Sequence, residues 1–288
     1  MNCVILNPTT TSNLRQRVIT GTYFVLIILL GTLAGKWPFI LLFGLILFAC
    51  LWEYYTLVAP KDIWKDLWRK YSGIIWGLIP YTLGIFLAHG TQLPGKQLAL
   101  LILLYMTALL AWFFIPELFV RRSERFSQAA LGLTGLIYVA LPFGCLPLIT
   151  IANGEYSFYQ VLAILVLVWA NDTGAYLTGM RWGKRLLLPQ ISPKKTWEGW
   201  MGGMVLTMLT GRLIAHFLDS WSVVDGLVIA ALVSVWGPLG DLVESMLKRE
   251  FEVKDSGQLL PGHGGVLDRF DAFLFALPPV ALYWLVIR

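Results

Sequence analysis

Charged residues are scarce in this 288-residue chain: they make up 14% of it, whereas an average soluble domain has about 25%. Hydrophobic residues account for 57%, and the mean hydropathy is +0.70. A water-soluble fold could not hide that much apolar surface from solvent. The composition therefore predicts an integral membrane protein.

Cysteine is also scarce. Cys3, Cys50 and Cys145 lie far apart and form no Cys-x-x-Cys pair, so the sequence indicates neither a disulfide framework nor a zinc site. A Walker motif is missing, as are internal repeats and low-complexity tracts. The formal charge of +5 could suggest nucleic acid, but in a membrane protein the placement of basic residues matters more than their sum, and we expect no nucleic acid partner.

Long apolar segments recur along the chain, each near the roughly 20 residues that a helix needs to cross a bilayer. They predict an all-α polytopic membrane protein with about nine spans, the first of which is a retained helix rather than a cleaved signal peptide. The expected spans are 18–35, 38–58, 72–91, 97–119, 129–151, 157–178, 199–218, 223–247 and 271–287. We divide them into an N-terminal scaffold, residues 1–150 with spans one to five, and a C-terminal catalytic region, residues 151–288 with spans six to nine.

Basic residues are distributed unevenly between the loops on the two sides of the predicted membrane. If the N-terminus is cytoplasmic, 18 of the 22 lysines and arginines fall in cytoplasmic segments. The positive-inside rule then predicts a cytoplasmic N-terminus and a C-terminus outside, which nine spans satisfy.

Polar residues enter the spans mainly in the second half of the chain. In the first half, acids such as Glu53 and Glu117 are assigned to loops or span ends of a lipid-facing scaffold. A charge within hydrocarbon costs about 2.5–3.5 kcal/mol even on a lenient scale, so acids inside spans call for a functional explanation. Span six ends with Asn171 and Asp172. Span eight carries a polar stripe at helical spacing, which consists of Asp241, Glu244, Ser245, Lys248 and Arg249.

Two cytoplasmic loops have compositions that suit phosphate groups. In the first, Ser192 and Pro193 predict the N-cap and first residue of a helix, beside Lys194, Lys195 and Thr196, and free N–H groups at a helix start can bind phosphate. The second loop, 254–271, is rich in glycine, which allows the backbone close to a ligand.

Two acids stand together where span nine begins. Asp268 and Asp271 share one helix face, and carboxylates without a cluster of His or Cys favour a hard cation such as Mg²⁺. His263, alone in the preceding loop, is more often structural than catalytic.

These motifs resemble the signature of phosphatidate cytidylyltransferases, also called CDP-diacylglycerol synthases. The similarity lies in Ser245-x-x-Lys248-Arg249-x4-Lys254-Asp255 followed by Pro261-Gly262-His263-Gly264-Gly265-x-x-Asp268-Arg269-x-Asp271. The segments Asn171-Asp172-x-Gly174-Ala175-Tyr176 and Ser192-Pro193-x-Lys195-Thr196-x-Glu198-Gly199 are similar to that family in the same order. The resemblance covers roughly residues 165–288.

The resemblance implies transfer of the cytidylyl group of CTP to phosphatidic acid, giving CDP-diacylglycerol and pyrophosphate. It also implies Mg²⁺ as cofactor, and a homodimer and membrane lipids as partners. The implied location is a bacterial plasma membrane, with the active site on the cytoplasmic side. Whether a second, monovalent cation shares the site is left open by the resemblance. The implied catalytic residues are Asp241, Asp268, Lys248, Arg249 and Arg269, and the implied metal ligands are Asp241, Asp268 and Asp271. The implied substrate-binding residues are Asn171, Asp172, Ser192, Lys194, Lys195, Thr196, Glu198, Ser245, Lys254, Asp255, His263, Gly264 and Gly265.

Other functions are compatible with parts of the pattern. A CDP-archaeol synthase or a polyprenol kinase would differ in the lipid accepted, and the full glycine-rich signature favours the diacyl lipid. An ion-coupled transporter would also place acids in its spans, but such acids lie near the midplane on broken helices of paired repeats. In this sequence the polar residues of the spans gather toward one face of the membrane, and no paired repeat is visible.

Overall fold

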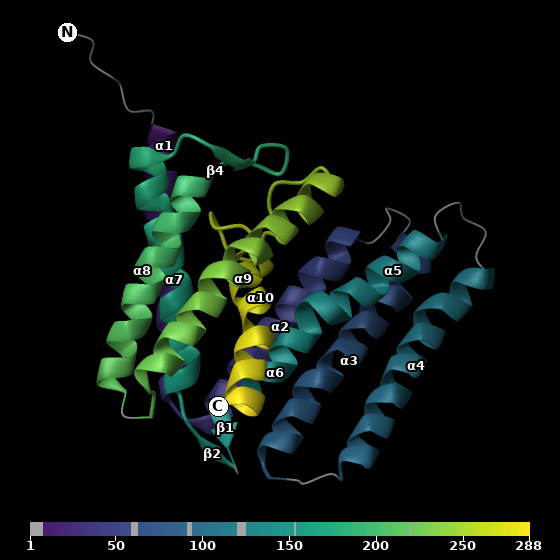
Figure 1. The fold of residues 1–288 in the computed structure, drawn as a ribbon. Helices are drawn as coiled ribbons and strands as arrows, with labels where there is room; N and C mark the ends of the chain where they lie inside the picture. The colour runs from purple at the N-terminus through teal and green to yellow at the C-terminus, as the bar shows by residue number, and fades with distance from the viewer. Residues whose placement is uncertain (1–7, 59–62, 91–93, 120–124, 153, 219) are drawn as a thin grey trace.

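A computed structural model describes the backbone of residues 8–58, 63–90, 94–119, 125–152, 154–218 and 220–288 (Figure 1). Within these ranges the fold is helical, as predicted, with two short antiparallel hairpins. The helices of the first half are α1 (Pro8–Leu33), α2 (Lys36–Val58), α3 (Ile63–Ala88), α4 (Gly95–Phe119), α5 (Arg125–Gly135), the π-helix η1 (Leu136–Ala140) and α6 (Leu141–Thr150). Those of the second half are α7 (Tyr159–Trp182), α8 (Trp197–Phe217), α9 (Val223–Glu250), α10 (Leu267–Leu282) and the π-helix η2 (Tyr283–Ile287).

Seven helical stretches among the described residues are long and apolar enough to cross a membrane. They match seven of the predicted spans, and the continuous run from α5 through η1 to α6 forms one of them. The exceptions are α1, whose described apolar part is the short stretch Val18–Leu33, and α8. The polytopic fold is confirmed, while the count of nine stays a prediction.

The helices are arranged in two groups around α10 (Figure 1). α7 and α8 stand together on one side, α3, α4 and α5 on the other, and α9 crosses obliquely in front of the centre. The start of α1 and the C-terminus lie at opposite ends of the molecule. The hairpin of β3 (Leu186–Leu188) and β4 (Ser192–Thr196) lies at the α1 end, and that of β1 (Ile151–Ala152) and β2 (Glu155–Tyr156) lies near the C-terminus.

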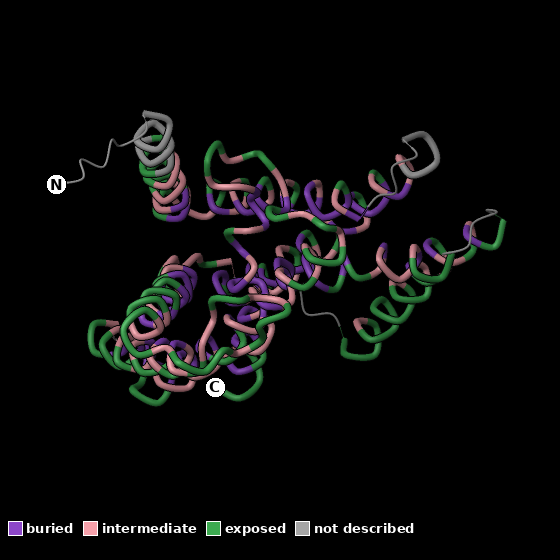
Figure 2. Tube along the Cα trace, turned by 90° about the horizontal axis from the view of Figure 1, so that it is seen from above, coloured by how far each residue is buried: buried purple, intermediate pink, exposed green. Residues whose placement is uncertain are grey.

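Aromatic side chains join the two halves of the chain in one core. Phe43 of α2 lies edge-on to Phe270 of α10, with ring centroids 6.4 Å apart, and Phe143 of α6 lies 6.1 Å from the same ring. All three are almost completely buried. Figure 2 shows the buried residues on the inward faces of the helices and exposed ones outside, as lipid-facing apolar side chains would be. The central α10, which carries Asp268 in its first turn, is therefore held by helices from both halves.

Two acids of the first half are buried, contrary to the expectation of a lipid-facing scaffold. Glu117 of α4 forms an ion pair with Arg69 of α3, and neither side chain is more than 7% exposed. Glu53 of α2 is 3% exposed and contacts the chain near residue 267, 214 residues away. Both acids lie in the last turns of their helices, as expected, but they join helices to one another instead of lying at a surface.

Candidate active site

The end of the molecule that holds β3 and β4 contains a cavity of about 450 Å³ between α7, α8 and α9. Several sequence-predicted site residues line it, together with aromatic and apolar residues such as Tyr176, Trp200 and Pro238. The predicted residues in its wall are Asn171, Asp172, Lys194, Lys195, Thr196 and Asp241. The structure therefore brings together three sequence motifs that lie up to 70 residues apart.

The predicted helix start at Ser192 and Pro193 is wrong. Ser192–Thr196 forms strand β4, which pairs with β3 in the register Leu186↔Thr196 and Leu188↔Ser192. The helix begins at Trp197, and Thr196 is its N-cap, with its Oγ1 accepting a hydrogen bond of 3.1 Å from Gly199 N. Because strand pairing uses the backbone groups of 192–196, the capping position moves four residues along the chain. The cradle of free N–H groups that was expected at residue 192 is not formed there.

Glu198, an implied substrate-binding residue, accepts hydrogen bonds from the backbone between α7 and the same hairpin. Its Oε2 accepts hydrogen bonds from Lys184 N at 3.0 Å and Arg185 N at 3.1 Å. These backbone N–H groups lower the pKa of the Glu198 carboxyl below its usual value. In this arrangement Glu198 fixes the turn after α7 against the start of α8, and so places Thr196 and the strand before it.

The polar stripe on α9 is present on one continuous helix, as predicted. Ser245 Oγ donates to Asp241 Oδ1 at 3.3 Å, one turn away. Lys195 of β4 forms an ion pair of 2.5 Å with Asp241 Oδ2. The segment 192–196, for which the sequence predicted phosphate binding, therefore meets the polar stripe of α9 at this acid. Arg249, at the exposed end of the stripe, donates to the carbonyl of Ile191 at 3.5 Å.

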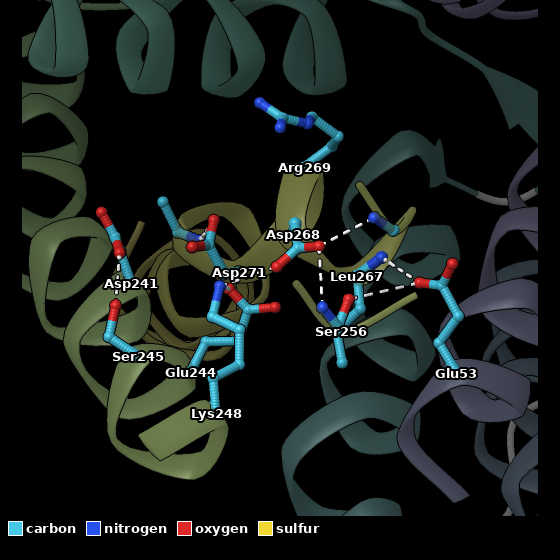
Figure 3. Close-up of polar contacts among 12 residues, drawn as sticks. Glu53, Asp241, Glu244, Ser245, Lys248, Ser256, Leu267, Asp268, Arg269 and Asp271 are labelled. Atoms are coloured by element: carbon cyan, nitrogen blue, oxygen red, sulfur yellow. Dashed lines mark hydrogen bonds and ion pairs between the residues drawn. The ribbon is translucent and has the colours of Figure 1, made fainter. Parts of the chain in front are cut away.

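Lys248 joins two carboxylates at the centre of the site (Figure 3). Its Nζ lies 2.8 Å from Glu244 Oε2 and 2.7 Å from Asp268 Oδ1. Glu244 is fully buried, and the side chains of Asp268 and Lys248 are only 6% and 14% exposed. Figure 3 shows Asp271 close to Glu244 and Lys248. We refer to Glu244, Lys248, Asp268 and Asp271 as the central cluster.

Asp268 is also bound by the backbone of the glycine-rich loop before it. Its Oδ2 accepts hydrogen bonds from Ser256 N at 2.9 Å and Gly265 N at 2.7 Å. The backbone of this loop thus approaches a carboxylate of the same chain, while its close approach to a ligand stays a prediction. Gly262 and Gly264 have positive φ values of 76° and 81°, which a side chain would disfavour.

The same loop surrounds a second, mainly polar cavity of about 740 Å³. Arg269, directly after Asp268, lines it, and its Nε donates to the carbonyl of His263 at 3.2 Å. The other predicted site residues in its wall are Lys254, Asp255, His263 and Gly264. Asp241, in the wall of the first cavity, lies on the same helix as Glu244 and Lys248, and Arg269, in the wall of the second, directly follows Asp268 in sequence.

The oxygen donors of this region suit Mg²⁺. Within the described ranges, no three His, Cys, Asp or Glu side chains are arranged to enclose a metal ion. Two buried oxygens, Glu244 Oε1 and Asn171 Oδ1, have no hydrogen-bond partner among the described residues. Mg²⁺ is commonly held by one or two carboxylates together with substrate phosphates and water, so a complete protein cage is not required. The residues therefore fit a magnesium ion that binds jointly with a substrate.

Glu53 is the main site-adjacent residue that sequence reasoning missed. It belongs to α2, yet its Oε2 accepts a hydrogen bond of 2.8 Å from Leu267 N at the start of α10. The sequence did contain a signal, because Glu53 lies within the apolar segment Leu51-Trp52-Glu53-Tyr54. Placing its charge in hydrocarbon costs as much free energy as for the acids of the second half. Its position near a span end concealed that signal.

Comparison with known proteins assigns the family. A model of the cytidylyltransferase family matches residues 15–287. The phosphatidate cytidylyltransferase of Bacillus subtilis (strain 168) is 35% identical over 282 residues, which covers 95% of this chain and 98% of that protein. The protein of the same name from Staphylococcus aureus (strain COL) is 36% identical over 226 residues, 77% of this chain and 84% of that protein. A third, from Staphylococcus haemolyticus, is 42% identical over 162 residues, 55% of this chain and 61% of that protein. Since the family model spans nearly the whole sequence, the chain belongs to the cytidylyltransferase family.

Proposed function

We propose that the protein transfers the cytidylyl group of CTP to phosphatidic acid, with CDP-diacylglycerol and pyrophosphate as products. The observation that carries the proposal is the central cluster, whose neighbours Asp241 and Arg269 line two separate cavities, in a chain that is similar over 95% of its length to a phosphatidate cytidylyltransferase. Two polyanionic substrates need cationic side chains where their phosphates meet, and lysine or arginine side chains line both cavities.

The reaction needs no nucleophile from the protein. A phosphomonoester has a second pKa of about 6, so the headgroup of phosphatidic acid is largely dianionic near neutral pH. One of its oxygens forms a bond to the α-phosphorus of CTP, and the bond from that phosphorus to the bridging oxygen of the β-phosphate breaks. Pyrophosphate leaves with the electron pair, and no proton has to move to a side chain. Catalysis then consists of aligning the two phosphates and stabilising charge.

The side chains divide this work according to their positions. We assign CTP to the cavity between α7, α8 and α9, where Lys195 and Thr196 face the polar end and Trp200 offers an aromatic face. We assign the phosphatidate headgroup to the central cluster and the loop cavity, within reach of Lys248 and Arg269. Arg249 lies at the exposed end of the stripe, where it can meet a lipid headgroup near the membrane surface.

The carboxylates are proposed to hold Mg²⁺ together with the nucleotide. Asp241, Asp268 and Asp271 are the ligands we propose, and they would act one or two at a time with phosphate oxygens. When bound, the ion would neutralise charge on the phosphates and on the departing pyrophosphate. A second, monovalent cation and a homodimer stay predictions from the resemblance.

The direct test of the proposal uses purified protein in detergent micelles with labelled CTP, Mg²⁺ and phosphatidic acid. We expect labelled CDP-diacylglycerol and one pyrophosphate per turnover. Parallel reactions with an archaeal ether-linked lipid and a polyprenol separate the related lipid enzymes. No CDP-lipid with phosphatidic acid, but product with one of the other lipids, would contradict the proposed substrate.

Replacing Lys195 by alanine is expected to raise the KM for CTP about tenfold, because a charge-assisted contact contributes about 1.5–3 kcal/mol. The KM for phosphatidic acid should stay the same. Lys184→Ala, at an exposed position outside both cavities, is the matched control. Steady-state kinetics with each substrate varied separately checks this, and an effect on the lipid alone would place Lys195 at the other substrate.

We propose a bacterial plasma membrane location with both cavities facing the cytoplasm. In a variant lacking the three native cysteines, Arg185→Cys should react with a membrane-impermeant maleimide only in inverted vesicles. Glu155→Cys, exposed in β2 at the opposite end of the molecule, should react only in intact, right-side-out membranes. The reverse pattern would invert the topology and move the site to the outer face.

A further inference from the structure

Glu53 links the N-terminal half of the chain to the part of the structure that carries the central cluster. It stands one turn before the end of α2, and it is 3% exposed. Its carboxylate accepts hydrogen bonds from Ser256 and Leu267, more than 200 residues along the chain. The hydrogen bonds of this buried acid therefore connect α2 with the segment that leads into α10.

The carboxylate of Glu53 binds the first turn of α10 from outside the helix. Its Oε2 accepts from Leu267 N at 2.8 Å and from Ser256 Oγ at 3.5 Å. The residue at the N-cap position of α10, Val266, has no side chain that could accept a hydrogen bond. Glu53 therefore replaces the missing cap, and a negative charge at a helix start is also favoured by the helix dipole.

Ser256 extends this contact to Asp268. Its hydroxyl donates to Glu53, and its backbone N–H donates to Asp268 Oδ2 at 2.9 Å. Leu267, the other partner of Glu53, directly precedes Asp268 in sequence. The position of the Asp268 carboxylate is thus tied to Glu53 by two short connections, one through the start of α10 and one through Ser256 (Figure 3).

Two glycines leave the space that Glu53 occupies. A Cβ at Gly257 would lie 2.3 Å from Glu53 Oε1, and its three nearest atoms would all belong to Glu53. A Cβ at Gly265 would lie 2.5 Å from Glu53 Oε2. The loop therefore fits around the carboxylate on both sides, and even a methyl group at Gly257 would have to displace it.

We infer that Glu53 is a positioning residue for cytidylyl transfer: it caps α10 from α2 and, through Leu267 and Ser256, fixes the Asp268 carboxylate in the central cluster. The inference rests on the proposed function. It assigns the N-terminal half a part in the reaction beyond that of a scaffold. Because Glu53 touches neither cavity, its loss should change the rate at saturating substrate more than substrate binding.

The first experiment compares Glu53→Ala, Glu53→Asp and Glu53→Gln with the wild type. Loss of a supporting residue of this kind typically costs about 10–100-fold, and we expect Glu53→Ala to lower kcat within that range while the KM for CTP stays nearly constant. Glu53→Gln keeps a side-chain oxygen at the same reach and should recover most of the rate. Glu53→Asp is one methylene shorter and should resemble Glu53→Ala.

A control separates positioning from general loss of stability. Glu117→Gln removes the charge of another buried acid of the same half, whose partner Arg69 lies outside the site. We expect this variant to lower the Tm in detergent without lowering kcat. If Glu53→Ala and Glu117→Gln lower kcat equally, or if Glu53→Ala keeps the wild-type kcat, the inference is wrong. If the wild type itself forms no CDP-lipid, it is the proposed function that fails.

A double-mutant cycle tests the mechanism even if one variant is unstable. Gly257→Ala alone should lower kcat, because its methyl group displaces the Glu53 carboxylate and hence the loop. In a Glu53→Ala background the same methyl group has room, so adding it should change kcat little. Strong non-additivity is expected for residues in direct contact. Independent, multiplying effects would contradict a route through Glu53.

Discussion

Asp268→Asn is expected to abolish turnover while the protein stays folded and inserted in the membrane. The asparagine oxygen can still accept the hydrogen bonds from Ser256 N and Gly265 N, so the loop keeps its backbone contacts. On the other side, an amide group would face the Lys248 ammonium, which now lies 2.7 Å from Asp268 Oδ1. A charged ion pair is replaced by two donors that cannot bond each other.

The expected loss for Asp268→Asn is at least about 100-fold in kcat, the order found when one preorganised electrostatic group is removed. Two consequences combine: Lys248 loses the partner that holds it in place, and one of the proposed magnesium ligands disappears. The measurement is the rate of CDP-diacylglycerol formation, with folding checked by gel filtration and Tm. Glu252→Gln, at an exposed position outside both cavities, should leave the rate unchanged. Normal turnover in Asp268→Asn would remove this acid from the active site.

The sequence allowed good prediction of the features that depend on local patterns. The stripe from Asp241 to Arg249 has helical spacing, and a continuous helix α9 carries it. Hydropathy likewise located the long apolar helices, because a span must satisfy its own backbone and present apolar side chains to lipid. α1 and α8 are the weakest cases, since polar or small residues dilute the apolar signal there.

Features that depend on contacts between distant segments were not predictable in this way. Ser192 and Pro193 have the residue types of a helix start, but pairing with Leu186–Leu188 makes that segment a strand. Glu53 is recognisable in the sequence as an acid in an apolar segment, but its hydrogen-bond partners are not, because Leu267 and Ser256 are more than 200 residues away. Local propensity could not reveal either outcome, since in both cases the competing interaction comes from elsewhere in the fold.

Lys248→Met is the second substitution from which we expect a large effect, and here the effect includes stability. Lys248 lies between Glu244 Oε2 and Asp268 Oδ1, at 2.8 Å and 2.7 Å. Methionine fills a similar volume but provides no charge, so two buried carboxylates lose their common cation. Removing one partner of a buried ion pair typically costs about 3–5 kcal/mol. We expect a clearly lower Tm in detergent and no measurable CDP-diacylglycerol.

A second substitution distinguishes the two effects of Lys248→Met. Adding Glu244→Gln removes one of the two uncompensated charges at a fully buried position, so the Tm should recover in part. Activity should not recover, because the ammonium that we propose to meet the phosphates is still missing. If the double variant regains activity along with stability, Lys248 serves only to neutralise Glu244. In that case Arg269, which lines the loop cavity, would be the principal cation for the phosphatidate headgroup.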